Sequence, residues 1–264
     1  MTPTDLDHVG FAVNDASRTL RDLYQRGVLL PVAGEEDEGF RYVIGGRQIR
    51  DRGIRIELLD PNRSRDSFLA HYLQEHGEGA HHITFMVDDL DATLAALHRA
   101  DIAVTRVDLS YPPWREAFIH PRSGLGTVVQ IASSVHTYPF GCDHHHTGNA
   151  TDMPHRQTGH NRHWWRQALG YTTAPAVAKT VTAVELGVAG PAVARTVFSS
   201  VLGGRETIST RTGVTSYVWP SGTIEVAPAT PPQVNMLYIG GSENDVEGPG
   251  FALGHTKFVA GDPR

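Results

Sequence analysis

Two segments of the chain share an alternating pattern of apolar and polar residues that begins with histidine. Residues 8–15 read His-Val-Gly-Phe-Ala-Val-Asn-Asp, and residues 82–89 read His-Ile-Thr-Phe-Met-Val-Asp-Asp. Alternation with a period of two predicts a half-buried strand. Each segment runs into apolar residues at helical spacing, and the pairs that end the segments, Asn14/Asp15 and Asp88/Asp89, supply the candidate helix N-caps. The chain therefore contains an internal repeat of a strand followed by a helix.

Each copy closes on a strongly apolar strand, at residues 54–59 in the first copy and 126–131 in the second. Shorter apolar runs broken by Gly and Pro lie between, so the units, residues 1–60 and 80–133, read βαβββ. An amphipathic helix over residues 67–77 links them. The sequence predicts an α+β fold in which paired βαβββ units form a cupped mixed sheet within a domain of residues 1–135.

Strand alternation also predicts which side chains meet in the cup. His8 and His82 lie opposite the apolar faces of their strands, and Glu57 and Gln130 do so in the closing strands. The spacing is nearly the same in both copies, because 49 residues separate His8 from Glu57 and 48 separate His82 from Gln130. Copies related by a pseudo-twofold axis would bring these four side chains together, which predicts a metal site. His81 falls on the other face and is expected to be structural.

Several motifs are similar to the vicinal oxygen chelate (glyoxalase/bleomycin resistance/dioxygenase) superfamily, over residues 5–133. Within it the sequence most resembles the methylmalonyl-CoA epimerase type. The resemblance implies a divalent cation held by His8, Glu57, His82 and Gln130. The motifs are Asp7-His8-Val9, Ile56-Glu-Leu-Leu-Asp-Pro61, Phe68-Leu69, Gly79-Ala-His-His82-Ile, Val87-Asp-Asp-Leu90, Phe118-Ile-His-Pro-Arg-Ser123 and Val129-Gln130.

Two features depart from the epimerase pattern that this resemblance implies. Epimerases of this type have the ligand order His, Gln, His, Glu, whereas this chain has His, Glu, His, Gln. Their acid/base groups are carboxylates, and the corresponding positions here hold Tyr42 and Gln130. The resemblance therefore transfers the fold better than the reaction.

Two imidazoles, a carboxylate and an amide oxygen suit Fe, Mn, Co, Ni or Zn, and leave positions for the vicinal oxygens of a substrate. We expect the metal to chelate a small oxygenated substrate, either with or without a carboxylate group. The expected reaction is an enolate-type isomerisation, epimerisation or elimination. Glu57 is the candidate base and Tyr42 a second proton carrier. Trp114 and Arg115 are candidates for binding an apolar group and an anion of the substrate.

Two other functions are consistent with the same residues. His8, His82 and Glu57 match the two-histidine, one-carboxylate set of non-haem Fe(II) dioxygenases, although the usual sequence signature of extradiol ring cleavage is absent. A metal-free cup that sequesters a ligand, as in resistance proteins of the superfamily, is the third interpretation.

The second half repeats the unit in degenerate form over residues 181–264. A His-rich connecting segment, residues 136–180, precedes it, and the histidines between 143 and 163 lack the spacing of a structural zinc motif. Ala183 and Asn235 are expected where His8 and His82 stand in the first half, and only Glu225 keeps its type. Since 29 residues follow Asn235, the C-terminal unit is expected to be truncated and metal-free, covering the first domain or making a subunit contact in a homodimer.

The charge and cysteine content of the chain limit the partners and the compartment that we expect. Lys and Arg total 23 against 29 Asp and Glu, a net charge of −6, which disfavours nucleic acid or anionic membranes as partners. The one cysteine, Cys142, cannot form an internal disulfide, and residues 1–7 lack the features of a signal peptide. We therefore expect a cytoplasmic protein with a small-molecule substrate.

Overall fold

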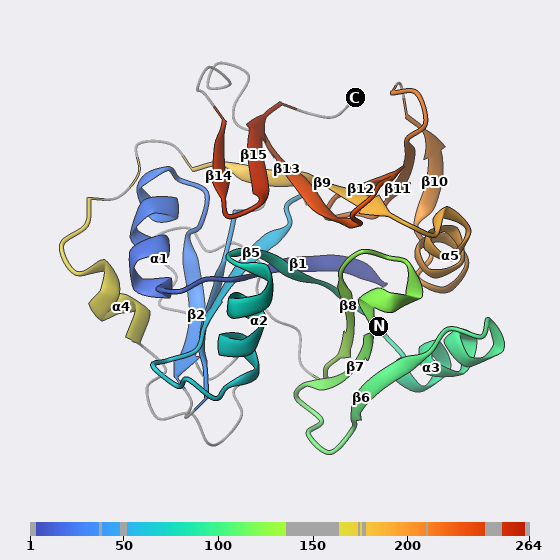
Figure 1. Ribbon diagram of the computed structural model, residues 1–264, viewed down its shortest axis with the longest axis horizontal. Helices are drawn as coiled ribbons and strands as arrows, with labels where there is room; N and C mark the ends of the chain where they lie inside the picture. The colour runs from blue at the N-terminus through green and yellow to red at the C-terminus, as the bar shows by residue number, and fades with distance from the viewer. Residues whose placement is uncertain are drawn as a thin grey trace.

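The computed structural model describes residues 4–36, 39–47, 52–135, 164–173, 175, 178–209, 211–240 and 250–261, which form two mixed sheets (Figure 1). The first sheet has the strand order β2-β3-β4-β1-β5-β8-β7-β6. Its strands are β1 (Asp5–Ala12), β2 (Pro31–Glu36), β3 (Arg41–Gly45), β4 (Arg55–Asp60), β5 (Gly79–Met86), β6 (Val104–Asp108), β7 (Arg115–Ile119) and β8 (Val128–Ser133).

The two halves of this sheet repeat each other. β1 pairs with β4 in parallel, as β5 does with β8, and the two opening strands β1 and β5 pair antiparallel at the centre. Helix α1 (Ala16–Gln25) follows β1, and α3 (Leu90–Arg99) follows β5. This arrangement confirms the predicted pair of βαβββ units.

The helix boundaries follow from their caps. The Asp15 side chain accepts a hydrogen bond from the Arg18 backbone N–H, and Asp89 does the same for Ala92, which satisfies amides that have no partner within the helix. Ser67 caps α2 (Phe68–His76), which ends at Gly77 with φ 74°. A short 3₁₀ turn, Pro121–Ser123, leads into β8.

The second sheet has the order β10-β11-β12-β9-β13-β15-β14. Its third βαβββ unit is complete, and the predicted truncation falls in the fourth, where the described residues form three strands and no helix. A short helix, α4 (Trp164–Leu169), precedes this sheet. The elements are β9 (Thr180–Val188), α5 (Pro191–Arg195) continued by a π-helical stretch (Thr196–Val201), β10 (Arg205–Ile208), β11 (Thr215–Val218), β12 (Thr223–Pro228), β13 (Gln233–Gly240), β14 (Phe251–Leu253) and β15 (Thr256–Ala260).

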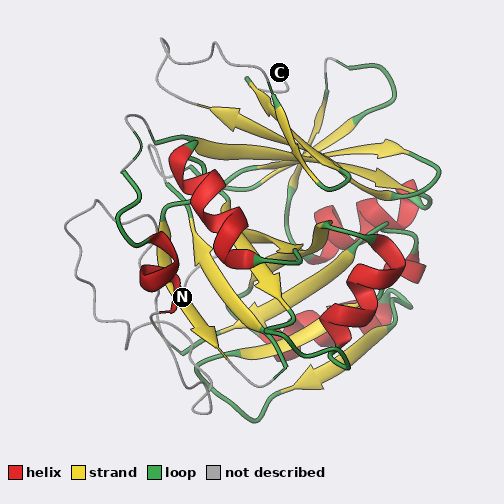
Figure 2. Cartoon of the chain, turned by 60° about the vertical axis from the view of Figure 1, so that its left-hand side comes forward, coloured by secondary structure: helices red, strands yellow, loops and turns green. Residues whose placement is uncertain are grey.

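The core lies between the apolar faces of the two sheets, and in Figure 2 the second sheet lies above the first. Phe11 of β1 stacks on Phe258 of β15 with ring centroids 5.6 Å apart, and Phe85 of β5 contacts Phe198 and Trp219. Because side chains alternate along a strand, the opposite faces of both sheets point away from this core. The concave face of the first sheet is therefore available for a site.

Two of the sequence expectations, those for Cys142 and for the histidines between 143 and 163, concern residues that lie outside the described part of the chain. Within the described part of the chain, no helix has the length and apolar character needed to cross a membrane.

Candidate metal centre

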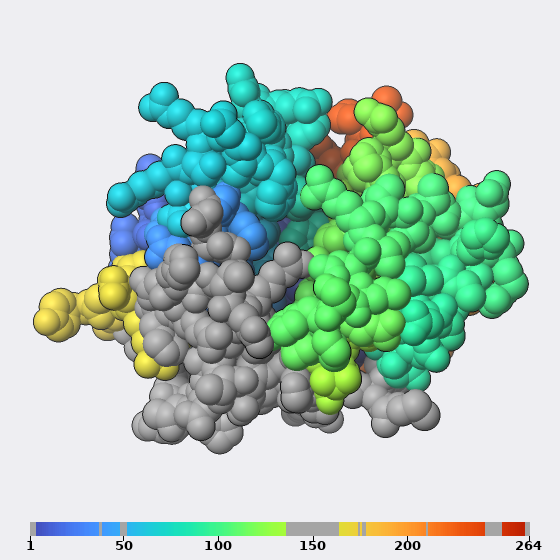
Figure 3. All heavy atoms as spheres, turned by 90° about the horizontal axis from the view of Figure 1, so that it is seen from below, coloured from blue at the N-terminus to red at the C-terminus, as the bar shows by residue number. Residues whose placement is uncertain are grey.

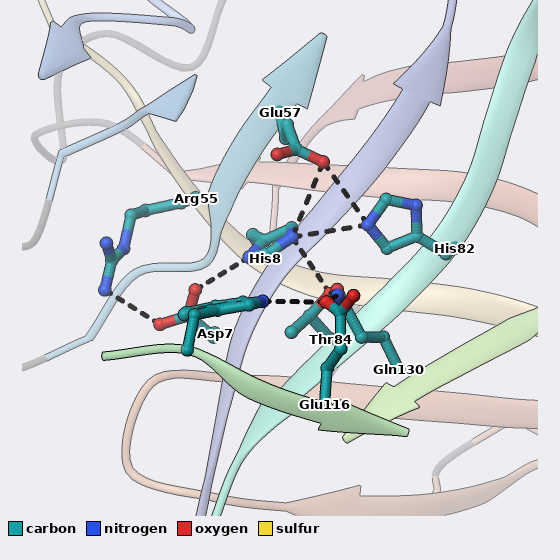
Figure 4. Close-up of polar contacts among 9 residues, drawn as sticks. Asp7, His8, Arg55, Glu57, His82, Thr84, Glu116 and Gln130 are labelled. Atoms are coloured by element: carbon teal, nitrogen blue, oxygen red, sulfur yellow. Dashed lines mark hydrogen bonds and ion pairs between the residues drawn. The ribbon is translucent and has the colours of Figure 1, made fainter. Parts of the chain in front are cut away.

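Three of the four predicted ligands meet on the concave face of the first sheet (Figure 4). His8 lies on β1, Glu57 on β4 and His82 on β5, so the three central strands each contribute one side chain. The two Nε2 atoms are 3.3 Å apart, and Glu57 Oε2 lies 3.3 Å from His82 Nε2 and 3.7 Å from His8 Nε2.

A backbone irregularity brings Asp7 to the same face as its neighbour His8. The pairing of β1 with β5 shifts register between Leu6 and His8, which interrupts the alternation at Asp7. His8 Nδ1 donates to Asp7 Oδ2 over 2.7 Å, and the Arg55 guanidinium binds Asp7 Oδ1 over 2.8 Å. Asp7 therefore fixes the His8 ring so that its Nε2 lone pair points at Glu57 and His82.

Both carboxylates of this centre are held ionised. Burial raises the pKa of Asp7, but the Arg55 charge and the His8 hydrogen bond outweigh it and keep the pKa below its usual value. Burial likewise raises the pKa of Glu57, and the hydrogen bond and charges of the two imidazoles lower it further than burial raises it. A carboxylate that stays charged in a buried site is a ready ligand for a cation.

The missing side chain of Gly10 makes room for His82. A Cβ at Gly10 would lie 2.1 Å from His82 Cε1 and 2.5 Å from His82 Nδ1, far inside van der Waals contact. Gly10 pairs directly with His82 across β1 and β5. The His82 ring therefore lies over β1 at Gly10, and a side chain at that position would displace the ring.

Gln130 reaches the cluster through Thr84. The buried Thr84 hydroxyl donates to Gln130 Oε1 over 2.6 Å and lies 2.9 Å from His8 Nε2. The Gln130 amide nitrogen donates to Glu116 Oε2, which also accepts from Trp114 Nε1, both over 2.8 Å. Sequence reasoning missed both Thr84 and Glu116. The alternation of β5 could have found Thr84, which is two residues from His82.

The centre lies in a cavity of about 810 Å³, lined by aromatic and polar side chains. Figure 3 looks onto this face, where the surface is hollowed between the segment around α2 and that around β6 and β7. Tyr42, the candidate proton carrier, and Trp114, a candidate substrate-binding residue, line the cavity. Arg115 is not among the lining residues and pairs with Asp91 of α3 over 3.0 Å. Arg106 of β6 lines the cavity instead.

The expectation that His81 falls on the face opposite His82 is wrong. The pairing with β1 shifts register between residues 80 and 82, so His81 is an extra residue in β5 and also lines the cavity. Its Nδ1 lies 3.0 Å from His82 Nδ1. Burial, followed by the charges of His82, His76 and Arg106, lowers the pKa of His81 to about 3, which keeps the ring neutral.

The second sheet carries no copy of this cluster among its described residues. Ala183 stands in the His8 position, as the sequence predicts, since it pairs with Thr223 as His8 pairs with Arg55. The His82 position is held by Met236 rather than Asn235, because β13 has a bulge at residue 235 like the one in β5. Glu225 keeps the Glu57 position and accepts from Ser216 Oγ over 2.6 Å.

The donor set of the first sheet fits a divalent metal. Ligand bonds of about 2.0–2.1 Å place neighbouring donor atoms about 3.0–3.4 Å apart, and the three separations here are 3.3, 3.3 and 3.7 Å. Two imidazoles and one carboxylate carry a charge of about −1 and suit a borderline transition metal. His8, Glu57 and His82 could therefore hold the ion, with Gln130 one hydrogen bond away.

Comparisons with known proteins found similar solved structures. Similar solved structures include a methylmalonyl-CoA epimerase variant from Streptomyces coelicolor in complex with 2-nitronate-propionyl-CoA (26% identity, 52% of this chain and 99% of that chain, TM-score 0.46). They also include methylmalonyl-CoA epimerase from Mycobacterium tuberculosis (24% identity, 49% of this chain and 87% of that chain, TM-score 0.43). A third is a hypothetical protein from Bacillus halodurans (24% identity, 52% of this chain and 99% of that chain, TM-score 0.45). No curated protein matches the chain in sequence.

One protein-family model also matches the chain. Residues 7–118 match the model described as Glyoxalase/Bleomycin resistance/Dioxygenase superfamily. This span begins just before His8 and contains three of the four predicted ligands. The chain thus contains a domain of the glyoxalase/bleomycin resistance/dioxygenase superfamily, which is the superfamily that the sequence motifs predict.

Proposed function

We propose that the chain is a metal-dependent enzyme that chelates a small oxygenated substrate and stabilises an enolate-type intermediate, as an isomerase, epimerase or lyase. The observation that carries this proposal is the cluster of His8, Glu57 and His82, whose ligand atoms lie within 4.8 Å of one another in the wall of a large cavity. A divalent cation bound there would polarise a substrate carbonyl and stabilise developing negative charge on its oxygen.

The chain's own residues supply the proton transfer in this proposal. Glu57 is the candidate base, because its carboxylate is ionised and faces the cavity. Tyr42 lines the same cavity and is the candidate second proton carrier. Glu116 adds a carboxylate to the cavity wall, where it accepts a hydrogen bond from the Gln130 amide nitrogen. Two acid/base groups on different strands are what an epimerisation requires.

One observation favours a second candidate function. Two histidines and one carboxylate with further coordination positions open are also the ligand set of non-haem Fe(II) oxygenases. The indirect contact of Gln130 with the cluster, through Thr84, is consistent with three protein ligands rather than four. In that case the chain is a dioxygenase, and the metal decides between the two reactions.

Solvent exchange and oxygen uptake separate these functions. The protein is loaded with Co²⁺, Zn²⁺ or Fe²⁺ and incubated in D₂O with methylmalonyl-CoA or phenylpyruvate, and deuterium incorporation at the carbon next to the carbonyl is followed by NMR. Incorporation that requires metal and disappears in Glu57→Gln supports the enolate reaction. Oxygen consumption with Fe²⁺ and catechol supports the dioxygenase. Binding without either reaction contradicts both and leaves a ligand-sequestering protein.

A further inference from the structure

We infer that the substrate is an anion with a flat apolar body, and that Arg106 binds its anionic group at a distance from the metal centre. This inference rests on the proposed function, because it assumes that the other end of the substrate is chelated at His8, Glu57 and His82. It follows from the backbone at Arg106, from the ion pairs of the surrounding arginines and from the aromatic cavity wall.

The backbone at Arg106 is strained in a way that changes which residues face the cavity. Arg106 has φ 49°, a left-handed conformation that is uncommon for residues other than glycine. It lies in a bulge, since β6 pairs through Thr105 with Phe118 and next through Asp108 with Glu116. Four consecutive residues, 105–108, consequently line the cavity, where regular alternation would allow only two.

Of the two arginines that line the cavity, Arg106 is the one that has no carboxylate partner among the described residues. Arg55, also in the cavity wall, forms an ion pair with Asp7 over 2.8 Å, and Arg115 pairs with Asp91. Asp108, two residues from Arg106, accepts hydrogen bonds from the backbone N–H and the hydroxyl of Ser110. The positive charge of Arg106 therefore remains available to an anion that enters the cavity.

Arg106 opens onto the same cavity as the metal centre, because the lining of that cavity includes Arg106 together with His8, Glu57 and His82. The cavity of about 810 Å³ is at the large end of the range for small-molecule sites, and a chelating group of a few atoms would fill little of it. The remaining volume has room for a body that reaches from the metal to Arg106.

The cavity that holds the metal centre and Arg106 also has apolar and aromatic side chains in its lining. Phe40 and Phe68 pack edge to face with centroids 6.0 Å apart, and Trp114 and Phe118 lie in the opposite wall. Phe68 and Val107, which line this cavity, remain 44% and 49% exposed, so part of their apolar surface is open to a ligand. A flat apolar group is the chemistry that this wall would bind.

Hydroxamates test this inference because they chelate divalent metals through vicinal oxygens. Zinc-loaded protein is titrated by calorimetry with acetohydroxamate, benzohydroxamate and 4-carboxybenzohydroxamate. We expect benzohydroxamate to bind more tightly than acetohydroxamate, and the carboxylated probe to bind most tightly. In Arg106→Gln the carboxylated probe should lose about 10- to 100-fold in affinity, the range for a hydrogen bond to a charged group, while benzohydroxamate should be unchanged.

Two arginine variants control the result. Arg99→Gln removes the same charge from the end of α3, outside the cavity lining, and should change neither affinity. An equal loss for both aromatic probes in Arg106→Gln, or a selective loss in Arg115→Gln instead, overturns the role of Arg106. Equal binding of acetohydroxamate and benzohydroxamate overturns the apolar body. If none of the probes binds in a zinc-dependent manner, the proposed function itself fails.

Discussion

Replacing Gly10 with alanine should disable the metal centre while the sheet remains folded. The new Cβ would lie 2.1 Å from His82 Cε1, whereas carbon atoms in contact are about 3.5–4.0 Å apart. The His82 ring must therefore move by about 1.5 Å, and metal sites tolerate about 0.2 Å in ligand distances. We expect the overpacking to cost about 1–3 kcal/mol of unfolding free energy, and the affinity for Zn²⁺ or Co²⁺ to fall at least about 10-fold.

The assay is a titration of Co²⁺ into metal-free protein, followed by its visible absorption, with urea unfolding measured on the same samples. Gly240→Ala is the matched control, because a Cβ there would meet Thr182 Cγ2 at 3.3 Å, and Gly240 lies on β13 of the second sheet. The control should bind metal as the wild type does. Unchanged Co²⁺ affinity in a folded Gly10→Ala variant would show that His82 is not a ligand.

Three further predictions follow from individual contacts. Asp7→Asn should lower the affinity for Zn²⁺ about 10- to 100-fold in calorimetry, because the carboxylate that orients His8 is lost; an unchanged affinity would contradict that role. Burial raises the pKa of Asp5, so its ionisation should destabilise the fold as pH rises above about 4. Urea unfolding at pH 4 and pH 7 should show a smaller loss of stability over this interval in Asp5→Asn than in the wild type, and an equal loss would refute the assignment. Phe198→Ala should cost about 3–5 kcal/mol in urea unfolding, because Phe198 is fully buried between the sheets; a loss under 1 kcal/mol would contradict a shared core.

The internal repeat in the sequence predicted most of the first sheet. The spacing of His8 to Glu57 and of His82 to Gln130 predicted the side chains on the central strands, because strand pairing in both units follows the same register. Three of these side chains meet. The engagement of Gln130 with Thr84 and Glu116 depends on distances between strands, which alternation along one strand does not contain.

The bulges explain the other differences. Asp7, His81 and Asn235 each lie where β1, β5 or β13 departs from regular pairing, so a period of two assigns the wrong face or the wrong equivalent residue after that point. The bulge at Arg106 likewise explains why regular alternation does not identify Arg106 as a candidate for binding the substrate. Residue types at these positions give no simple signal of a bulge, since none of them is glycine.

The metal content of protein purified without chelators tests the central claim most directly. The wild-type chain and His145→Ala, which changes the His-rich segment, should each hold about one divalent ion per chain by elemental analysis, and His82→Ala should hold none after dialysis. If His82→Ala retains the metal and His145→Ala loses it, the ion is not bound at the cluster of His8, Glu57 and His82, and the account given for this centre is wrong.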